Sequence, residues 1–164
     1  MAMSERTSVV HGTFRIERTY PAPPSRVFAA FADPAAKRRW FVEGEGWDVK
    51  GHTLEFRVGG REESRFLFRG GPPGAPPAGT EMGNDTTYQD IVPDERIVFA
   101  YTMAVAGRRI SASLATVELA PTGAGTRLVF TEQAAFFEGA DGPAMREQGW
   151  KALLDALGAE LRRA

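Results

Sequence analysis

Residues 143–162 have the sequence PAMREQGWKALLDALGAELR, in which apolar side chains recur at the spacing of an α-helix. These apolar residues are Met145, Trp150, Leu153, Leu154, Leu157 and Leu161. The segment follows a long stretch of alternating β sequence that contains no comparable helix. An amphipathic helix after an antiparallel sheet buries its apolar side best across the concave face of that sheet. Helix and sheet together can then enclose a cavity.

Alternation of apolar and polar residues predicts the strands before this helix. In the first strand, expected at 13–20, Phe14, Ile16 and Tyr20 alternate with polar residues. Glycine and proline dominate 70–79, which we expect to be a mobile hairpin tip, either a lid or a disordered loop. The further strands are predicted at 47–58, 62–69, 81–92, 96–105, 109–119 and 126–136.

Two short helices are predicted between the first and second strands. The first covers 23–31, where proline suits the first turn and apolar residues share one face. Asp33 is expected to cap a second helical piece from Pro34 to about Trp40. The predicted fold is therefore α+β, with about seven antiparallel strands, two short helices after the first strand, and a long C-terminal helix.

Composition indicates one domain over residues 1–164, with 1–11 as a flexible N-terminus. The net charge of −1 provides no long-range field for nucleic acid or anionic lipid, and short basic runs such as Lys37-Arg38-Arg39 are expected to be solvated. No run approaches the roughly 18 apolar residues of a membrane span, so we expect no membrane insertion and a cytoplasmic location.

No catalytic, metal or cofactor site is predicted. Cysteine is absent, which excludes disulfides and thiolate chemistry. The two histidines, His11 and His52, lie far apart, and neither a nucleophile elbow nor a phosphate-binding loop is present. Glu81, Asp90 and Glu132 could form a carboxylate pair for acid–base chemistry, although their spacing also fits solvated strand residues.

The element order and several short motifs resemble those of the START-like helix-grip (SRPBCC) superfamily. Within it, the chain is similar to the branch named after the activator of the heat-shock chaperone ATPase, over residues 13–161. This resemblance implies a curved antiparallel sheet wrapped around the C-terminal helix, with a ligand cavity between them. The residues that carry it are RTYPAP at 18–23 leading into Val27-Phe28, Asp33-Pro34, Trp40-Phe41, Thr131-Glu132-Gln133 through Phe136-Phe137, and Gly149-Trp150 with Leu153-Leu154 and Leu157.

Strand parity predicts which side chains face the final helix. They either fill the interior completely or leave a cavity of small-ligand size, and we predict the cavity. Tyr88, together with Trp47 and Gln133, could add hydrogen bonds there. The predicted lining residues are Phe56, Phe66, Phe68, Phe99, Tyr101, Met103, Leu128, Phe130, Trp150 and Leu154.

Two charged residues, Arg18 and Glu132, fall on the same inward face. In the helix-grip fold the first and last strands are neighbours, so we expect the two side chains to meet across the sheet. They would either orient the polar end of a ligand or form a structural bridge, and an unpaired Glu132 in apolar surroundings would have a raised pKa.

The leading functional hypothesis is non-catalytic binding of a small hydrophobic or amphipathic molecule in the cavity. The alternative is a cyclase- or dehydratase-like enzyme that acts on a polyketide-like substrate in the same cavity. A third possibility is the chaperone cofactor that the branch name suggests, although we expect no room for a separate N-terminal chaperone-contacting domain. Trp40 and Phe41, expected to be exposed, could form a homodimer contact or the gate of the pocket.

Overall fold

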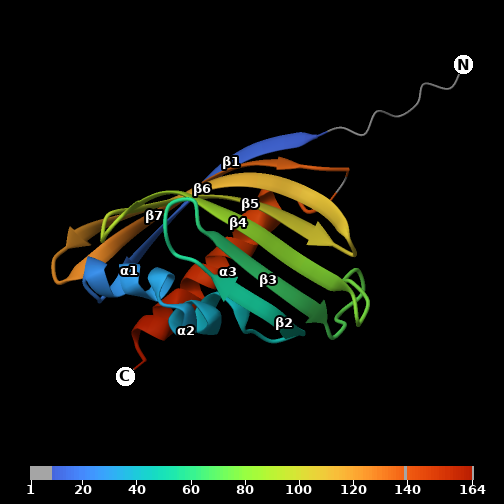
Figure 1. The fold of residues 1–164 in the computed structure, drawn as a ribbon, viewed down its shortest axis with the longest axis horizontal. Helices are drawn as coiled ribbons and strands as arrows, with labels where there is room; N and C mark the ends of the chain where they lie inside the picture. Colours follow the sequence, from blue (N-terminus) through green and yellow to red (C-terminus); the bar gives the residue numbers. More distant parts are fainter. Residues whose placement is uncertain (1–8, 139, 164) are drawn as a thin grey trace, which may run out of the picture.

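A seven-stranded antiparallel sheet arches over one long helix in the computed structural model, which describes residues 9–138 and 140–163 (Figure 1). The strand order is β1-β7-β6-β5-β4-β3-β2, so the first and last strands pair, and the α+β helix-grip prediction is confirmed. The strands are β1 Val10–Tyr20, β2 Trp47–Leu54, β3 Arg61–Phe68, β4 Glu81–Val92, β5 Arg96–Val105, β6 Arg108–Thr122 and β7 Gly125–Phe136. The helices are α1 Pro24–Ala32, α2 Pro34–Lys37, the π-helical turn η1 Arg38–Val42, and α3 Pro143–Leu161.

Several predicted strand boundaries need correction, among them the end of the strand expected at 109–119, since β6 continues to Thr122. The first strand begins at Val10, so residues 10 and 11 belong to β1 and not to a flexible terminus, while residues 1–8 of that expected terminus lie outside the described residues. The second strand ends at Leu54, and Phe56 lies in the following loop, where Glu55 and Gly60 close turns through backbone hydrogen bonds. Apolar alternation alone does not reveal such a strand end.

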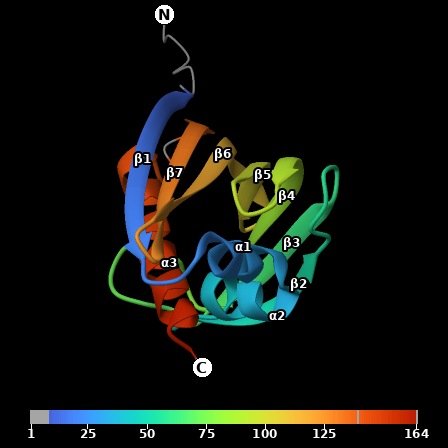
Figure 2. The same ribbon diagram turned by 90° about the vertical axis from the view of Figure 1, so that its left-hand side faces the viewer.

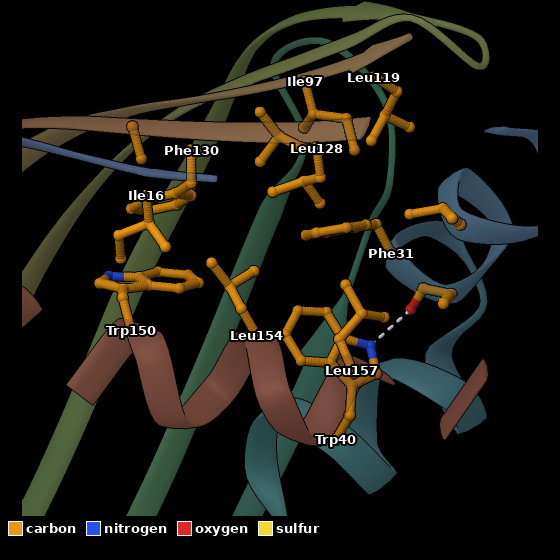
Figure 3. Close-up of a cluster of buried hydrophobic side chains, with 14 of the residues drawn as sticks. Ile16, Phe31, Trp40, Ile97, Leu119, Leu128, Phe130, Trp150, Leu154 and Leu157 are labelled. Carbon is orange, nitrogen blue, oxygen red and sulfur yellow. Dashed lines mark hydrogen bonds between the residues drawn. The ribbon is translucent and has the colours of Figure 1, made fainter. Parts of the chain in front are cut away.

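The main core lies between α3 and the concave face of the sheet. Trp150, Leu154 and Leu157 are almost fully buried, and Figure 3 shows them pointing from α3 toward the strands. The Trp150 ring lies 4.2 Å from the Phe130 ring of β7, measured between centroids. Full burial of one such side chain contributes roughly 1.5–3 kcal/mol, so these contacts fix where the helix docks.

The predicted apolar face of α3 is divided between two environments. Leu154 and Leu157 are fully buried in the core, whereas Leu153 is half-buried and the Met145 side chain is 67% exposed. A hydrogen bond of 2.7 Å from the Tyr20 hydroxyl to the Leu154 carbonyl oxygen ties α3 to the end of β1. The helix therefore lies beside β1 (Figure 2) and presents its other apolar side elsewhere.

The corner formed by α1, α2 and η1 closes one end of the molecule. Asp33 caps α2 as predicted, because its Oδ2 accepts a hydrogen bond of 3.2 Å from the Ala36 amide. Trp40, expected to be exposed, is 2% exposed: its indole N–H donates to the Ala30 carbonyl oxygen over 2.9 Å and its ring packs against Phe31. The helical phase inside η1 turns this residue inward.

The two sides of α3 predict different stability losses for adjacent leucines. Leu154→Ala should lower the free energy of unfolding by about 2–5 kcal/mol, because it leaves a void in a packed core. Leu153→Ala should cost only about 1 kcal/mol, since that side chain is half-buried. Urea denaturation of both variants measures the difference. Equal losses would show that α3 is rotated from the position described.

Candidate functional site

A pocket of about 520 Å³ lies between α3, η1 and the inner face of β2 to β5. Its wall is mostly apolar, and its rim includes the exposed Met145. The lining residues are Trp40, Phe41, Glu43, Gly44, Trp47, Phe66, Met82, Asn84, Tyr101, Met103, Asp141, Met145, Arg146, Gly149, Trp150, Ala152, Leu153 and Ala156.

Small side chains on α3 keep this pocket open. Gly149, Ala152 and Ala156 recur at helical spacing on the side of α3 that lines the pocket. A Cβ atom built on Gly149 would have no atom within 4 Å. The spacing of these three residues was visible in the sequence, but it became informative only once the core side of the helix was known.

The wall is rich in adaptable and aromatic groups. All three tryptophans of the chain and every methionine in the described part of it, Met82, Met103 and Met145, line the pocket. Methionine is flexible and polarizable, so it fits ligands of different shapes. The tryptophans also give the pocket an intrinsic fluorescent reporter.

A buried polar network, here called the Glu132 network, stands behind one end of the pocket. Glu132 accepts hydrogen bonds from the Tyr101 hydroxyl at 2.7 Å and the Ser113 hydroxyl at 3.0 Å. Arg146, in the first turns of α3, lies 3.5 Å from the same carboxylate and 2.9 Å from Asp141. Glu132 itself is fully buried and does not line the pocket.

The pKa of Glu132 is raised above its usual value. Burial is the main cause, and the hydrogen bonds from Tyr101 and Ser113 together with the charge of Arg146 offset it only in part. The charge of Arg146 is shared between two carboxylates, because its guanidinium lies closer to Asp141 than to Glu132. Burial also raises the pKa of the Tyr101 hydroxyl, so this group stays protonated and donates.

A second buried cluster, here called the Glu62 cluster, joins α2 to the sheet. Glu62 accepts hydrogen bonds from Lys37 at 3.1 Å and from the Tyr88 hydroxyl at 2.7 Å, while the His52 ring nitrogen lies 2.8 Å away. The Lys37 ammonium also lies 4.5 Å from the Phe41 ring centroid. Lys37 is only 3% exposed, so the expectation that it is solvated was wrong.

Glu62 and Glu132 have pKa shifts of opposite sign. Burial alone would raise the pKa of Glu62, but Lys37, His52 and Tyr88 lower it to about 2. The stabilisation from ionised Glu62 is thus present above about pH 4.5 and is lost as the pH falls toward 2. Sequence parity places Glu62 and Tyr88 inward, but nothing local pairs them with a lysine of α2.

The structure separates Arg18 from Glu132, which corrects their expected meeting. In the β1–β7 ladder Arg18 lies opposite Leu128, and Glu132 lies opposite Phe14, about 13 Å further along the strands. Arg18 instead forms an ion pair of 3.1 Å with Asp155 of α3. Strand parity correctly predicted that Arg18 and Glu132 lie on the inner face of the sheet. Their partners, however, are selected by the register of β1 against β7 and by the position of α3.

The predicted lining residues fall into three groups. Phe66, Tyr101, Met103 and Trp150 line the pocket. Phe56 and the half-buried Phe68 lie outside its lining, and Phe56 packs against Phe28 and Tyr88. The other predicted residues, Tyr88, Phe99, Leu128, Phe130 and Leu154, are buried in the main core.

Arg146 and Asn84 are pocket residues that the sequence did not single out. None of the lining residues comes from 70–79, so a role of that stretch as a lid stays a prediction. Across residues 9–138 and 140–163, no three or more histidine, aspartate or glutamate side chains are placed to hold a metal ion. Within the same ranges no helix is both long and apolar enough to cross a membrane.

The comparison with known families identifies one match. The model of the family described as "Activator of Hsp90 ATPase homolog 1-like protein" matches residues 21–162. No curated protein matches the chain.

Several solved structures are similar to nearly the whole chain. The Mll3558 protein from Rhizobium loti is 54% identical, with 93% of this chain and 99% of that chain covered and a TM-score of 0.82. A protein from Rhizobium leguminosarum is 39% identical, with 97% and 99% covered and a TM-score of 0.86. A protein from Chromobacterium violaceum is 29% identical, with 93% and 98% covered and a TM-score of 0.76.

The Glu62 cluster predicts a strong coupling between its two charges. Glu62→Gln should lower the free energy of unfolding by about 3–5 kcal/mol, because it leaves Lys37 buried without a counter-charge. The double variant Lys37→Met with Glu62→Gln should lose much less than the two single variants together. Urea denaturation measures this cycle, and Glu81→Gln in the exposed Lys50–Glu81 pair is the control. Additive losses would contradict the coupling.

The raised pKa of Glu132 predicts a pH-dependent effect of Glu132→Gln. A protonated Glu132 contributes stability that is fully present below its usual pKa of 4.5 and is lost as the pH rises through the folded-state pKa. Glutamine does not titrate, so the stability of the variant relative to wild type should increase as the pH rises above about 4.5. Thermal unfolding across this range tests the slope, and a falling relative stability would contradict it.

Proposed function

Because the chain belongs to the activator of Hsp90 ATPase homolog 1-like family, we propose that it binds a small, mostly apolar molecule in the pocket between the sheet and α3. The single observation that carries this proposal is the pocket itself, of about 520 Å³. Small-molecule pockets typically measure roughly 300–1,000 Å³ and are lined by apolar and aromatic side chains with a few polar groups. The wall built from Trp47, Phe66 and Met103 fits that description.

The polar groups near the pocket support binding more than catalysis. Glu132 is separated from the pocket by Tyr101 and Arg146, which line it and hold the carboxylate through a hydrogen bond and an ion pair. A general acid or base needs to reach its substrate within hydrogen-bond distance or through one water molecule. We therefore infer that the bound molecule is carried or sensed, not transformed.

One observation favours the enzyme alternative, which is the raised pKa of Glu132 close to the pocket. A cyclase- or dehydratase-like enzyme could use such a carboxyl on a polyketide-like molecule. Glu132→Gln separates the two roles: loss of turnover of such a molecule with retained binding would support the enzyme, whereas unchanged behaviour supports binding alone.

Filling the pocket from α3 tests the proposal directly. Gly149→Leu places a side chain where the structure has open space, so it should weaken binding of the neutral apolar dye Nile red at least about tenfold. The same change should keep or raise the stability of the free protein by about 0.5–1 kcal/mol, because glycine disfavours helix. Dye fluorescence and urea denaturation measure the two effects.

Ala159→Leu is the matched control, because Ala159 is exposed on the same helix and lies outside the pocket lining. It should leave dye binding unchanged. Native mass spectrometry of the purified protein would further reveal a co-purified ligand that Gly149→Leu lacks. Equal dye binding by wild type and Gly149→Leu would contradict the proposal.

A further inference from the structure

We propose, resting on the ligand-binding function above, that the pocket selects apolar molecules whose polar end donates hydrogen bonds, such as alcohols, phenols or amines, and that it rejects carboxylates. Most hydrogen-bond donors of the pocket wall are already engaged within the protein, whereas some acceptors are not.

The three indole N–H groups of the wall are all engaged within the protein. Trp40 donates to the Ala30 carbonyl oxygen at 2.9 Å, and Trp47 donates to the Val42 carbonyl oxygen at 2.8 Å. The Trp150 N–H donates to the Tyr101 hydroxyl at 3.1 Å. An indole N–H makes one hydrogen bond, so these rings offer the ligand only apolar surface.

Arg146, the cation in the wall, has its donors engaged as well. Its Nε donates to Asp141 at 2.9 Å, and its Nη2 donates to the Ser111 hydroxyl at 2.8 Å and to Asp141 at 3.2 Å. Its Nη1 donates to the Tyr101 hydroxyl at 3.0 Å and lies 3.5 Å from the Ser113 hydroxyl. These contacts account for all five N–H groups of a guanidinium. A ligand carboxylate therefore finds no available arginine donor.

The Tyr101 hydroxyl also makes all of its hydrogen bonds within the protein. It donates to Glu132 at 2.7 Å and accepts from Arg146 and Trp150, which uses its one hydrogen and both lone pairs. The amide of Asn84 is the remaining side-chain donor of the wall. As a neutral group, it does not compensate the desolvated charge of a carboxylate.

Acceptors, in contrast, remain available in and beside the wall. The carboxylates of Glu43 and Asp141 line the pocket, and the Asn84 Oδ1 atom is buried without a hydrogen-bond partner among the described residues. Ser64, which is only 1% exposed and lies outside the pocket lining, is directly opposite Asn84 in the β3–β4 ladder, and its Oγ also lacks a partner there. Because a hydroxyl can donate as well as accept, Ser64 does not itself distinguish donors from acceptors, whereas the Asn84 Oδ1 atom only accepts. A buried polar atom without a partner is unfavourable, so a ligand donor that reaches this spot is stabilised.

Charge acts in the same direction as hydrogen bonding. The pocket wall holds two carboxylates, Glu43 and Asp141, and one guanidinium, Arg146. Glu43 is paired at 3.2 Å with Arg38, but that pair is exposed and screened. With both wall carboxylates paired, an anionic ligand gains no net attraction from these charges, whereas a neutral or cationic donor can still contact a carboxylate oxygen.

Three probes with the same alkyl chain test this selectivity: 1-decanol, decylammonium and decanoate. Because all three tryptophans line the pocket, the change in tryptophan fluorescence on titration reports binding of each probe. At about pH 7.5 we expect 1-decanol and decylammonium to bind at least about tenfold more tightly than decanoate.

A pair of variants on β4 separates a ligand contact from a structural role. Asn84→Leu should weaken 1-decanol binding about five- to tenfold while the melting temperature of the free protein stays equal or rises, because a buried carbonyl oxygen without a partner is removed. Gln89→Leu likewise replaces a side-chain amide by leucine, at an exposed position of β4 outside the pocket, and should leave binding unchanged. A lowered melting temperature with unchanged 1-decanol affinity would overturn the assignment of Asn84.

The outcomes also distinguish this inference from the proposed function. Decanoate binding as tightly as 1-decanol, or more tightly, would overturn the selectivity for donors but leave the pocket as a binding site. The selectivity would also be overturned, with the pocket kept as a binding site, if Nile red bound and Gly149→Leu blocked it while 1-decanol and decylammonium did not bind. Failure of Nile red and all three probes to bind would instead count against the proposed function.

Discussion

The burial of Trp150, Leu154 and Leu157 against the concave face of the sheet is the interaction on which the rest of the structure depends. These side chains hold α3 close to β1, where Tyr20 and Arg18 add a hydrogen bond and an ion pair to the helix. The other side of α3 then faces β2 to β5 across small side chains, which do not fill the intervening space. The pocket is thus a consequence of asymmetric docking in a curved sheet.

Two buried sets of polar side chains, the Glu132 network and the Glu62 cluster, hold the walls of the pocket in place. The Glu132 network joins the first turns of α3 to β5, β6 and β7, and the Glu62 cluster joins α2 to β3 and β4. Burying charges is costly unless each is paired and hydrogen-bonded, which is the case for Lys37 with Glu62 and for Arg146 with Asp141. Such pairs specify one arrangement, because any displacement leaves a buried charge without its partner.

The hydrogen bonds and ion pairs that these side chains make within the protein limit which ligand groups the pocket can bind. Donors on the aromatic rings and on Arg146 are used to hold the wall together, so they are not available to bind a guest. What the wall offers is apolar surface, flexible methionine side chains and a few acceptors. The same contacts that stabilise the pocket therefore determine which polar groups it can receive.

The sequence alone determined the order of strands and helices, because side-chain periodicity is a local property. It also identified the inward faces, which carry the pocket residues Phe66, Tyr101 and Met103 but equally the core residues Phe99 and Phe130, so parity did not separate pocket from core. Only the tertiary structure decided that Glu132 meets Arg146 and that Lys37, from a basic run, is buried on Glu62. Such partners are far apart in the chain and are selected by strand register and by the rotation of α3, neither of which a local pattern encodes.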